Sequence, residues 1–323
     1  MGRFLFSRGL QSLVVLAVMS FVVYGLIGLM PGDPIYAMLS SDPSLTPKDV
    51  NRLLAVYGLD QPLMDRYLAW AAAALQGDFG YSRLFNAPVV DALIPALWNT
   101  LVLLGTALLV ALGIGLPLGV LAAANKGRMA DYLANFFAFA GISVPSFWLA
   151  IVLILVFAVG LGWFPAGGMA ALSGVDGSGW HPLAYLVLPV ASLALASAGG
   201  HTRYMRAAMI ETLRQDYIRT ARAKGLSETR VVLGHGLRNA MIPVATIIAL
   251  DFGFLFSGAL VAETVFAYPG MGKLIFDAIL GNDFNLALIG LMGATVVTLL
   301  GNLAADAAYA WLDPRVTFDE ITS

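Results

Sequence analysis

Long runs without a charged residue constrain this chain more than any other feature of its sequence. Between Asp131 and Asp176 lie 44 consecutive uncharged residues, and 34 lie between Asp91 and Lys126. About 20 mostly apolar residues are enough to cross the hydrocarbon core of a bilayer as a helix. Charged residues make up 12% of the chain, whereas soluble domains carry roughly 25%. The sequence therefore predicts a polytopic membrane protein and excludes disordered, collagen-like and disulfide-framework proteins.

Six stretches are long and apolar enough to be spanning helices. They cover about residues 10–30, 97–124, 133–161, 183–200, 241–262 and 286–311. The first follows Arg3 and Arg8, as in a signal peptide, but it is longer than the roughly 7–15 residues of a signal h-region and lacks a small-residue cleavage site. We interpret it as a retained first span.

The basic residues predict which way the chain crosses the membrane. Of the 18 Lys and Arg residues, 13 lie on one side of the six spans, and most of these are in the segment between the fourth and fifth. The 13 are Arg3, Arg8, Lys126, Arg128, Arg203, Arg206, Arg214, Arg219, Arg222, Lys224, Arg230, Arg238 and Arg315. The positive-inside rule places this side in the cytoplasm. We therefore expect both termini and the basic loop to be cytoplasmic.

The loop between the first two spans, residues 31–95, is expected outside the membrane and is too long for a simple connection. Thr46 and Pro47 are typical of a helix start, and Gly58 can end that helix. A second helix is expected from Pro62 to Leu75. This helical segment could be a structural cap over the outer mouth or a docking surface, and the sequence leaves both open.

The basic loop, residues 203–240, carries a helical pattern. Met205, Met209, Leu213, Tyr217 and Ala221 recur every four residues with charged residues between them, which predicts one amphipathic helix. Gly225 can end this helix, and Ser227 can start a second segment toward Asn239. A loop held near anionic headgroups would explain the charge, but a helix–Gly–helix pattern is more typical of a surface that meets a protein.

The sequence lacks the motifs expected of an enzyme active site. The sequence from Gly270 to Leu274 lacks the leading glycine and the hydroxyl residue of a phosphate-binding P-loop, so ATP hydrolysis is not expected here. Cysteine is absent, and the three histidines have no metal-ligand spacing, so no metal or cofactor is predicted. An intramembrane protease using Ser257 is an unfavoured alternative, because no general base is placed beside that serine.

Two acidic residues fall within the spans, Asp251 at the middle of the fifth and Asp306 near the end of the sixth. Intramembrane acids are functional-site hypotheses. Asp251 could line an aqueous translocation path or pair structurally with another helix. A proton- or ion-coupled secondary transporter would use such residues as carriers, although no convincing inverted repeat supports that class.

Motifs along nearly the whole chain resemble one family. In the basic loop they are YIRTARAKGLS (217–227) and HGLRNAMIP (235–243), and elsewhere they are PGDP (31–34), YGLDQP (57–62), GDFG (77–80), ETVFAYPGMG (263–272) and LDPR (312–315). In their order along the chain they resemble the permease subunits of binding-protein-dependent ABC importers of the dipeptide/oligopeptide/nickel class. The large outer segment resembles the first, B-type, of the two paired permeases.

The resemblance implies an all-α integral membrane protein with six transmembrane helices, the type I ABC importer (MetI-like) fold and a helical extracytoplasmic insertion. It divides the chain into an N-terminal segment with the first span (1–30), the insertion (31–95), the core permease domain (96–312) and a cytoplasmic tail (313–323). It also implies a multi-pass protein of the bacterial inner membrane. The implied partners are a second permease, two cytoplasmic ATPases and an external solute-binding protein, with no nucleic acid.

In this family the cytoplasmic loop, called the EAA loop, carries a coupling helix that docks on the ATPase. The coupling residues implied here are Arg219, Thr220, Ala221, Arg222, Ala223, Lys224, Gly225 and Leu226. The general pattern of Glu-Ala-Ala, three residues and Gly is altered, because Arg219 stands in place of the glutamate. We expect the small residues Ala221 and Ala223 to permit close approach of the ATPase. The class imports peptides, glutathione, nickel chelates, opines and some oligosaccharides, and peptide is expected here from family frequency.

Overall fold

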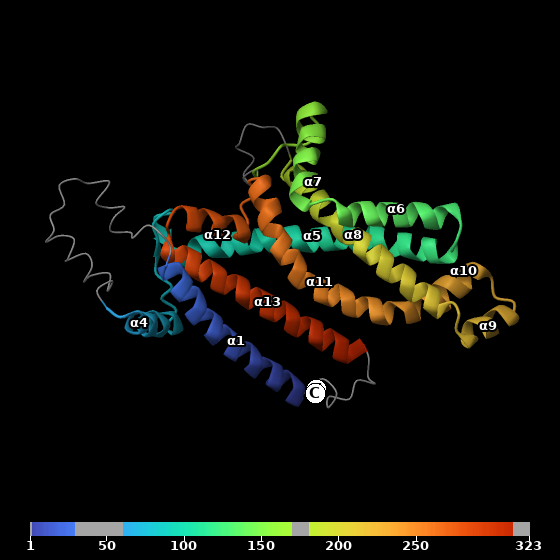
Figure 1. The fold of residues 1–323 in the computed structure, drawn as a ribbon, viewed down its shortest axis with the longest axis horizontal. Helices are drawn as coiled ribbons and strands as arrows, with labels where there is room; N and C mark the ends of the chain where they lie inside the picture. The colour runs from blue at the N-terminus through green and yellow to red at the C-terminus, as the bar shows by residue number, and fades with distance from the viewer. Residues whose placement is uncertain (1, 30–60, 170–180, 313–323) are drawn as a thin grey trace. The chain divides into compact units, whose positions relative to one another are not determined.

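The computed structural model describes residues 2–29, 61–169 and 181–312 and is built almost entirely of helices (Figure 1). Within these residues, side chains are not described for residues 2–5, 249–258, 305–306 and 308–312. The long helices are α1 (Gly2–Gly28), α5 (Val89–Ala124), α8 (Ala184–Thr212), α11 (Leu237–Val265) and α13 (Phe284–Leu312). The shorter elements are α4 (Leu63–Leu75), β1 (Tyr81–Ser82), β2 (Ala87–Pro88), α6 (Met129–Ser143), α7 (Ser146–Leu153), η1 (Ile154–Gly160), α9 (Asp216–Ala223), α10 (Glu228–Arg230), η2 (Val231–Gly236) and α12 (Met271–Leu280). The all-α membrane fold is confirmed.

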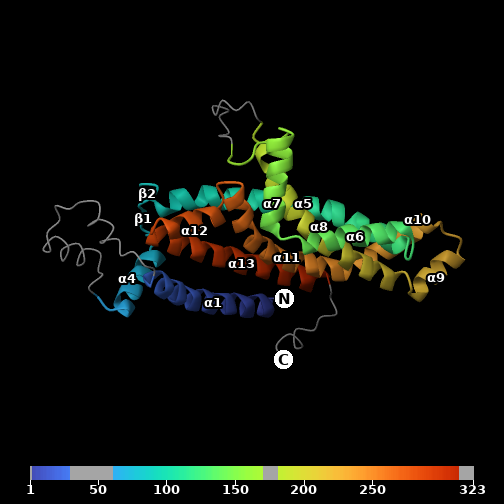
Figure 2. The ribbon, with the colours of Figure 1, turned by 45° about the horizontal axis from the view of Figure 1, so that its top comes forward.

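The third predicted span is bent rather than straight. Five helices in the described residues are long and apolar enough to cross a membrane, and α6 with the α7–η1 helix makes a sixth candidate that bends by 101°. Pro145 lies at the bend, between Ser143 and Ser146. A proline lacks the N–H that a continuous helix needs and disfavours helical geometry at the residue before it. In both views α7 stands away from the line of α6 (Figures 1 and 2).

The structure defines the ends of two predicted helices. The helix predicted from Pro62 to Leu75 is confirmed as α4 (Leu63–Leu75). The fourth span was expected to end near residue 200, but α8 continues to Thr212, because residues 201–212 contain neither proline nor glycine. The helix expected around residues 46–58 lies outside the described residues.

The chain forms two compact units. One is built on Trp98–Lys273, and the other on Gly9–Leu97 with Leu274–Val297. One apolar cluster of the first unit brings together α5, α7, α8 and α11. Its buried side chains are Leu103, Leu104, Ala107, Ala150, Leu153, Leu188, Val190, Leu193, Ala259, Ala262, Phe266 and Tyr268.

A buried polar junction fastens the end of α11 to α5 in this unit. The Thr100 hydroxyl donates to Glu263 Oε1 at 2.5 Å and accepts the Met271 N–H at 2.7 Å. The Lys273 N–H donates to the other Glu263 oxygen at 3.1 Å. Glu263 and Thr100 are both fully buried, and buried polar groups are stable only when they are paired. The first turn of α12 is therefore capped by two side chains from other helices, Thr100 of α5 and Glu263 of α11.

Tyr268 adds a second link at the same place. Its hydroxyl donates to the Asn99 carbonyl at 3.1 Å, and the Asn99 side chain donates to the Pro269 carbonyl at 2.9 Å. Burial, with a smaller contribution from the charge of Glu263, raises the pKa of Tyr268 to about 12. A phenol is protonated at physiological pH even at its ordinary pKa, and the raised pKa extends the donor role of Tyr268 to more alkaline pH.

The second unit has its own polar centre at Asp283. This buried carboxylate accepts from the Ser82 hydroxyl at 2.6 Å, the Leu84 N–H at 3.0 Å and the Leu286 N–H at 3.2 Å. The last bond caps α13. The first two hold the antiparallel β1–β2 hairpin, so the hairpin and the start of α13 are joined through one side chain.

Helix α4 packs on α1 in the same unit. The Tyr67 hydroxyl lies 2.8 Å from the Ser20 hydroxyl, and the Tyr67 ring meets the rings of Phe21 and Tyr24 with centroids 5.2 and 5.6 Å apart. Aromatic pairs at these distances are favourable beyond the area they bury. Part of the long loop after the first span is therefore packed against that span.

We expect Thr100→Val to destabilise the protein by about 2–4 kcal/mol, because it leaves both the buried Glu263 oxygen and the Met271 N–H without their partner. The measurement is the thermal unfolding of the purified protein in detergent. Thr106→Val on the same helix is the matched control, since the Thr106 hydroxyl bonds to the Val102 carbonyl of its own helix. Equal effects of the two substitutions would contradict the role assigned to the junction.

Candidate functional site

The helix predicted from Met205 to Ala221 is two helices. Helix α8 ends at Thr212, and α9 begins at Asp216 after an extended Gln215. Met205 and Met209 are buried in one apolar cluster with Val232 and Val244, whereas Ile218 and Ala221 belong to another with Val231. Leu213 packs against both clusters. The four-residue period correctly predicts helical structure. It does not show that these residues pack in two separate apolar clusters.

Helix α9 lies at the end of α8 in both views (Figures 1 and 2). Its inward face consists of Ile218, which is fully buried, and Ala221, whose exposed fraction is 6%. The outward face is exposed and consists of Asp216, Tyr217, Arg219, Thr220, Arg222 and Ala223. Helix α9 therefore uses its apolar residues to hold itself to the chain and presents polar and basic residues outward.

This placement corrects the expectation for Ala221. The sequence predicts that Ala221 contacts a partner, together with Ala223. In the structure Ala221 packs against Ile218 and Val231 within the chain, while Ala223 is exposed. The physical reason is that α9 must bury one face, and the residues three positions apart at 218 and 221 form it. Of the two alanines, Ala223 lies on the outward face.

Gly225 makes the turn that was predicted for it. Its φ is +77°, a conformation that costs a residue with a Cβ roughly 1–2 kcal/mol. The Gly225 N–H donates to the Arg222 carbonyl at 2.9 Å, and the Leu226 N–H donates to the Ala221 carbonyl at 3.4 Å. A Cβ at residue 225 would meet open space. Gly225 is required by backbone conformation and not by crowding.

An ion pair across this turn was not predicted. Arg222 donates from Nη2 and Nε to the two carboxylate oxygens of Glu228 at 2.6 and 3.1 Å. The pair joins α9 to α10, and both side chains are exposed. The sequence indicates a helix start at Ser227 and predicts no partner for the Glu228 that follows it. The sequence does carry a signal for this ion pair, namely opposite charges on the two sides of a predicted glycine turn. Such a turn brings residues six positions apart close together.

The second helical segment of the loop is confirmed and is longer than expected. From Glu228 the chain passes through α10 and the π-helical η2 into α11 without leaving helical geometry. The loop is therefore short: the residues outside helices are 213–215 and 224–227.

The two acidic residues of the spans are located only by their helices. Asp251 lies in α11 and Asp306 in α13, and both side chains lie outside the described ones. Among the residues that the structure describes, no three His, Asp or Glu side chains are grouped as a metal site would require.

Comparisons of the sequence with known families match nearly the whole chain. Residues 115–318 match the family described as the binding-protein-dependent transport system inner membrane component. Residues 1–102 match the N-terminal part of binding-protein-dependent transport system membrane components.

Individual relatives match over their full length. The oligopeptide transport system permease protein AppB of Bacillus subtilis is 38% identical over 98% of this chain and 100% of that protein. The glutathione transport system permease protein GsiC of Escherichia coli K12 is 37% identical over 98% of this chain and 100% of that protein. A putative peptide permease protein of Brucella suis is 39% identical over 98% of this chain and 99% of its own length.

Solved structures share the fold at lower sequence identity. One, described as an inward-facing conformation of the MetNI methionine ABC transporter, has a TM-score of 0.57 and 19% identity over 70% of this chain and 98% of that chain. Another, an amino acid ABC transporter with histidines, has a TM-score of 0.52 and 15% identity over 68% of this chain and 94% of that chain. These similarities confirm the MetI-like fold.

The two alanines of α9 should respond differently to enlargement. We expect Ala221→Trp to destabilise the purified protein by about 1–3 kcal/mol, because the site is already filled. Ala223→Trp should change stability by less than about 0.5 kcal/mol, as exposed substitutions usually do. Thermal unfolding of the two variants in the same detergent measures the difference, and equal losses would contradict the assignment of the two faces.

Proposed function

Because the chain belongs to the family of binding-protein-dependent transport system inner membrane components, we propose that its cytoplasmic loop couples transport to ATP hydrolysis on separate subunits. The chain is a multi-pass inner-membrane permease of an ABC importer and not an enzyme. It supplies membrane-spanning helices, and its ATPase partners supply the energy.

The outward face of α9 is the observation that supports this proposal. A short helix anchored by Ile218 and Ala221, ended by the Gly225 turn and tied to α10 by Arg222 presents a fixed surface. A fixed surface loses little conformational freedom when it binds, so more of the contact energy appears as affinity. The proposed coupling segment is residues 219–226, with Ala223 and the basic side chains contacting the ATPase and Ala221 holding the helix in place.

The proposed complex contains a second, different permease, two ATPases and an external solute-binding protein. This chain would form half of the translocation path, with Asp251 as a candidate residue of that path. The proposed topology has both termini and the coupling loop in the cytoplasm and residues 31–95 outside. It is supported by the 13 of 18 basic residues that this topology places inside, as the positive-inside rule requires.

The proposed substrate is a peptide or a related small solute. The support is that relatives covering this whole chain are named for oligopeptide and glutathione transport. In this proposal the external binding protein makes most of the selection, and ATP drives uptake. A proton-coupled carrier would instead require a proton gradient.

The coupling proposal predicts that Ala223→Trp abolishes uptake without lowering stability. The bulky ring would hold the ATPase away from α9 while leaving the chain's own packing unchanged. The measurement is ATP-dependent peptide uptake by proteoliposomes containing the whole complex, together with the amount of ATPase that co-purifies. Gly225→Val should also abolish uptake, because strain in the turn displaces α9, but this variant should lose about 1–2 kcal/mol of stability as well. Normal uptake and normal ATPase recovery in both variants would show that this loop is not the coupling element.

The topology is tested with single cysteines, because the chain has none of its own. Ser227→Cys, which follows the coupling segment and is exposed, should react with a membrane-impermeant maleimide only after the membrane is opened. Gln76→Cys, which follows α4 and is exposed, should react in intact cells. The opposite pattern would overturn the orientation, and with it the contact between α9 and a cytoplasmic ATPase.

A further inference from the structure

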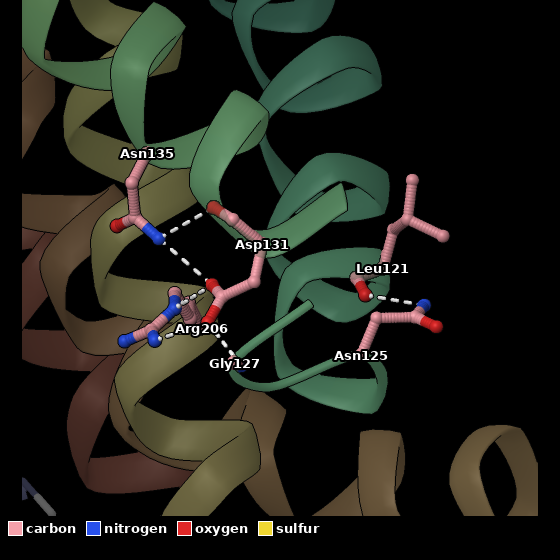
Figure 3. Close-up of polar contacts among 6 residues, drawn as sticks. All are labelled: Leu121, Asn125, Gly127, Asp131, Asn135 and Arg206. Atoms are coloured by element: carbon pink, nitrogen blue, oxygen red, sulfur yellow. Dashed lines mark hydrogen bonds and ion pairs between the residues drawn. The ribbon is translucent and has the colours of Figure 1, made fainter. Parts of the chain in front are cut away.

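Asp131 and Arg206 form an ion pair that joins α6 to α8 (Figure 3). Arg206 Nε lies 2.6 Å from Asp131 Oδ1, and Nη2 lies 2.8 Å from Oδ2. The Asp131 side chain is 5% exposed. Two parallel bonds from a planar guanidinium fix the direction of approach as well as the distance.

The same carboxylate holds two further groups (Figure 3). The Asn135 side chain donates to Oδ1 at 2.8 Å, and the Gly127 N–H donates to Oδ2 at 2.9 Å. Gly127 lies in the turn between α5 and α6. Asp131 thus connects this turn, the first two turns of α6 and α8. Asp131 is buried, whereas the Arg206 side chain is 26% exposed. Because even a fully buried ion pair can often be replaced by apolar residues without loss of stability, the geometry that this pair imposes is a more specific contribution than stabilisation.

Beyond the ion pair, α6 and α8 approach closely along their length. A Cβ at Gly199 would collide with the Ala138 carbonyl oxygen, and one at Gly141 would lie 2.7 Å from the Leu195 carbonyl oxygen. Backbones in such contact leave little room for sliding. The close packing reaches nearly to Ser143, where α6 ends and the 101° bend into α7 follows.

In the other direction, α8 leads to the coupling segment. Less than two helical turns separate Arg206 from Thr212, the last residue of α8. Leu213 then packs against the clusters on both sides of the break, next to Met209 and next to Ile218. The ion pair therefore lies between α9 and the bend at Pro145.

We propose that the Asp131–Arg206 pair makes α6 and the cytoplasmic half of α8 one rigid lever, which carries the displacement of α9 to the Pro145 bend and α7. Asp131 and Arg206 are positioning residues, because they act through the helices that they hold. This inference rests on the coupling role proposed for α9. Without the pair, the end of α8 could bend under load, and ATP would be hydrolysed without moving α7.

The test uses the whole complex reconstituted in proteoliposomes, with the variants Asp131→Asn and Arg206→Lys. Asp131→Asn removes the charge at constant size, and Arg206→Lys keeps the charge but loses the two-pronged contact. Arg203→Lys is the control, since Arg203 lies one turn away on α8 and also reaches α6, by stacking on Phe139, but makes no two-pronged ion pair there. The readouts are the amount of a labelled oligopeptide transported per ATP hydrolysed, and the distance between two spin labels. The labels are at Asp216→Cys, which is exposed at the start of α9 and lies outside residues 219–226, and at Phe147→Cys on α7.

In the parent complex we expect the label distance to be the same without nucleotide and with ATP bound. In Asp131→Asn and Arg206→Lys it should differ between the two states, and transport per ATP should fall at least tenfold. Arg203→Lys should retain the parent values.

Three results would overturn the lever: a nucleotide-dependent distance in the parent, an unchanged transport-to-ATP ratio in both variants, or a loss of yield with a normal ratio in the molecules that remain. The last would show that the pair is structural. If one variant fails to assemble, the other carries the test. Absence of ATP-dependent uptake in the parent would instead refute the proposed function, so the two failures are distinguishable.

Discussion

The satisfaction of backbone hydrogen bonds without water is the constraint on which this structure depends. In the hydrocarbon core an unpaired N–H or C=O is so costly that spanning segments must be helical. Where a helix ends or bends, other groups must take over. Glu263 and Thr100 accept the N–H groups at the start of α12, and Asp131 accepts the Gly127 N–H before α6. Carboxylates and hydroxyls therefore concentrate at the joints between helices.

These joints explain why the sequence predicts the helices better than their arrangement. Uncharged runs show the spans, Gly225 shows a turn, and the proline and glycine around α4 show its limits. A proline at residue 145 signals a break, but the 101° angle depends on the helices that α7 packs against. Nothing local pairs Thr100 with Glu263 or Asp131 with Arg206, because the partners are 163 and 75 residues apart.

The coupling segment shows the same limit at smaller scale. Ala221 and Ala223 are the same residue type two positions apart, and the sequence assigned both to a partner. Their environments differ because Val231, beyond the glycine turn, covers one face of α9. Periodicity predicts that a helix has an inner face, but the segment that covers this face must be known before the face can be identified.

The hairpin held by Asp283 has a consequence for how the protein is made. Ser82 must wait for a carboxylate that is synthesised 201 residues later. At roughly 5–20 residues per second during synthesis, this delay is on the order of 10–40 s. During that interval the helices from α5 to α12 are synthesised, while the hairpin lacks the acceptor for its Ser82 hydroxyl and Leu84 N–H. The second unit is thus completed only when the last span is synthesised. A chain truncated before Asp283 lacks the contact between this carboxylate and the hairpin.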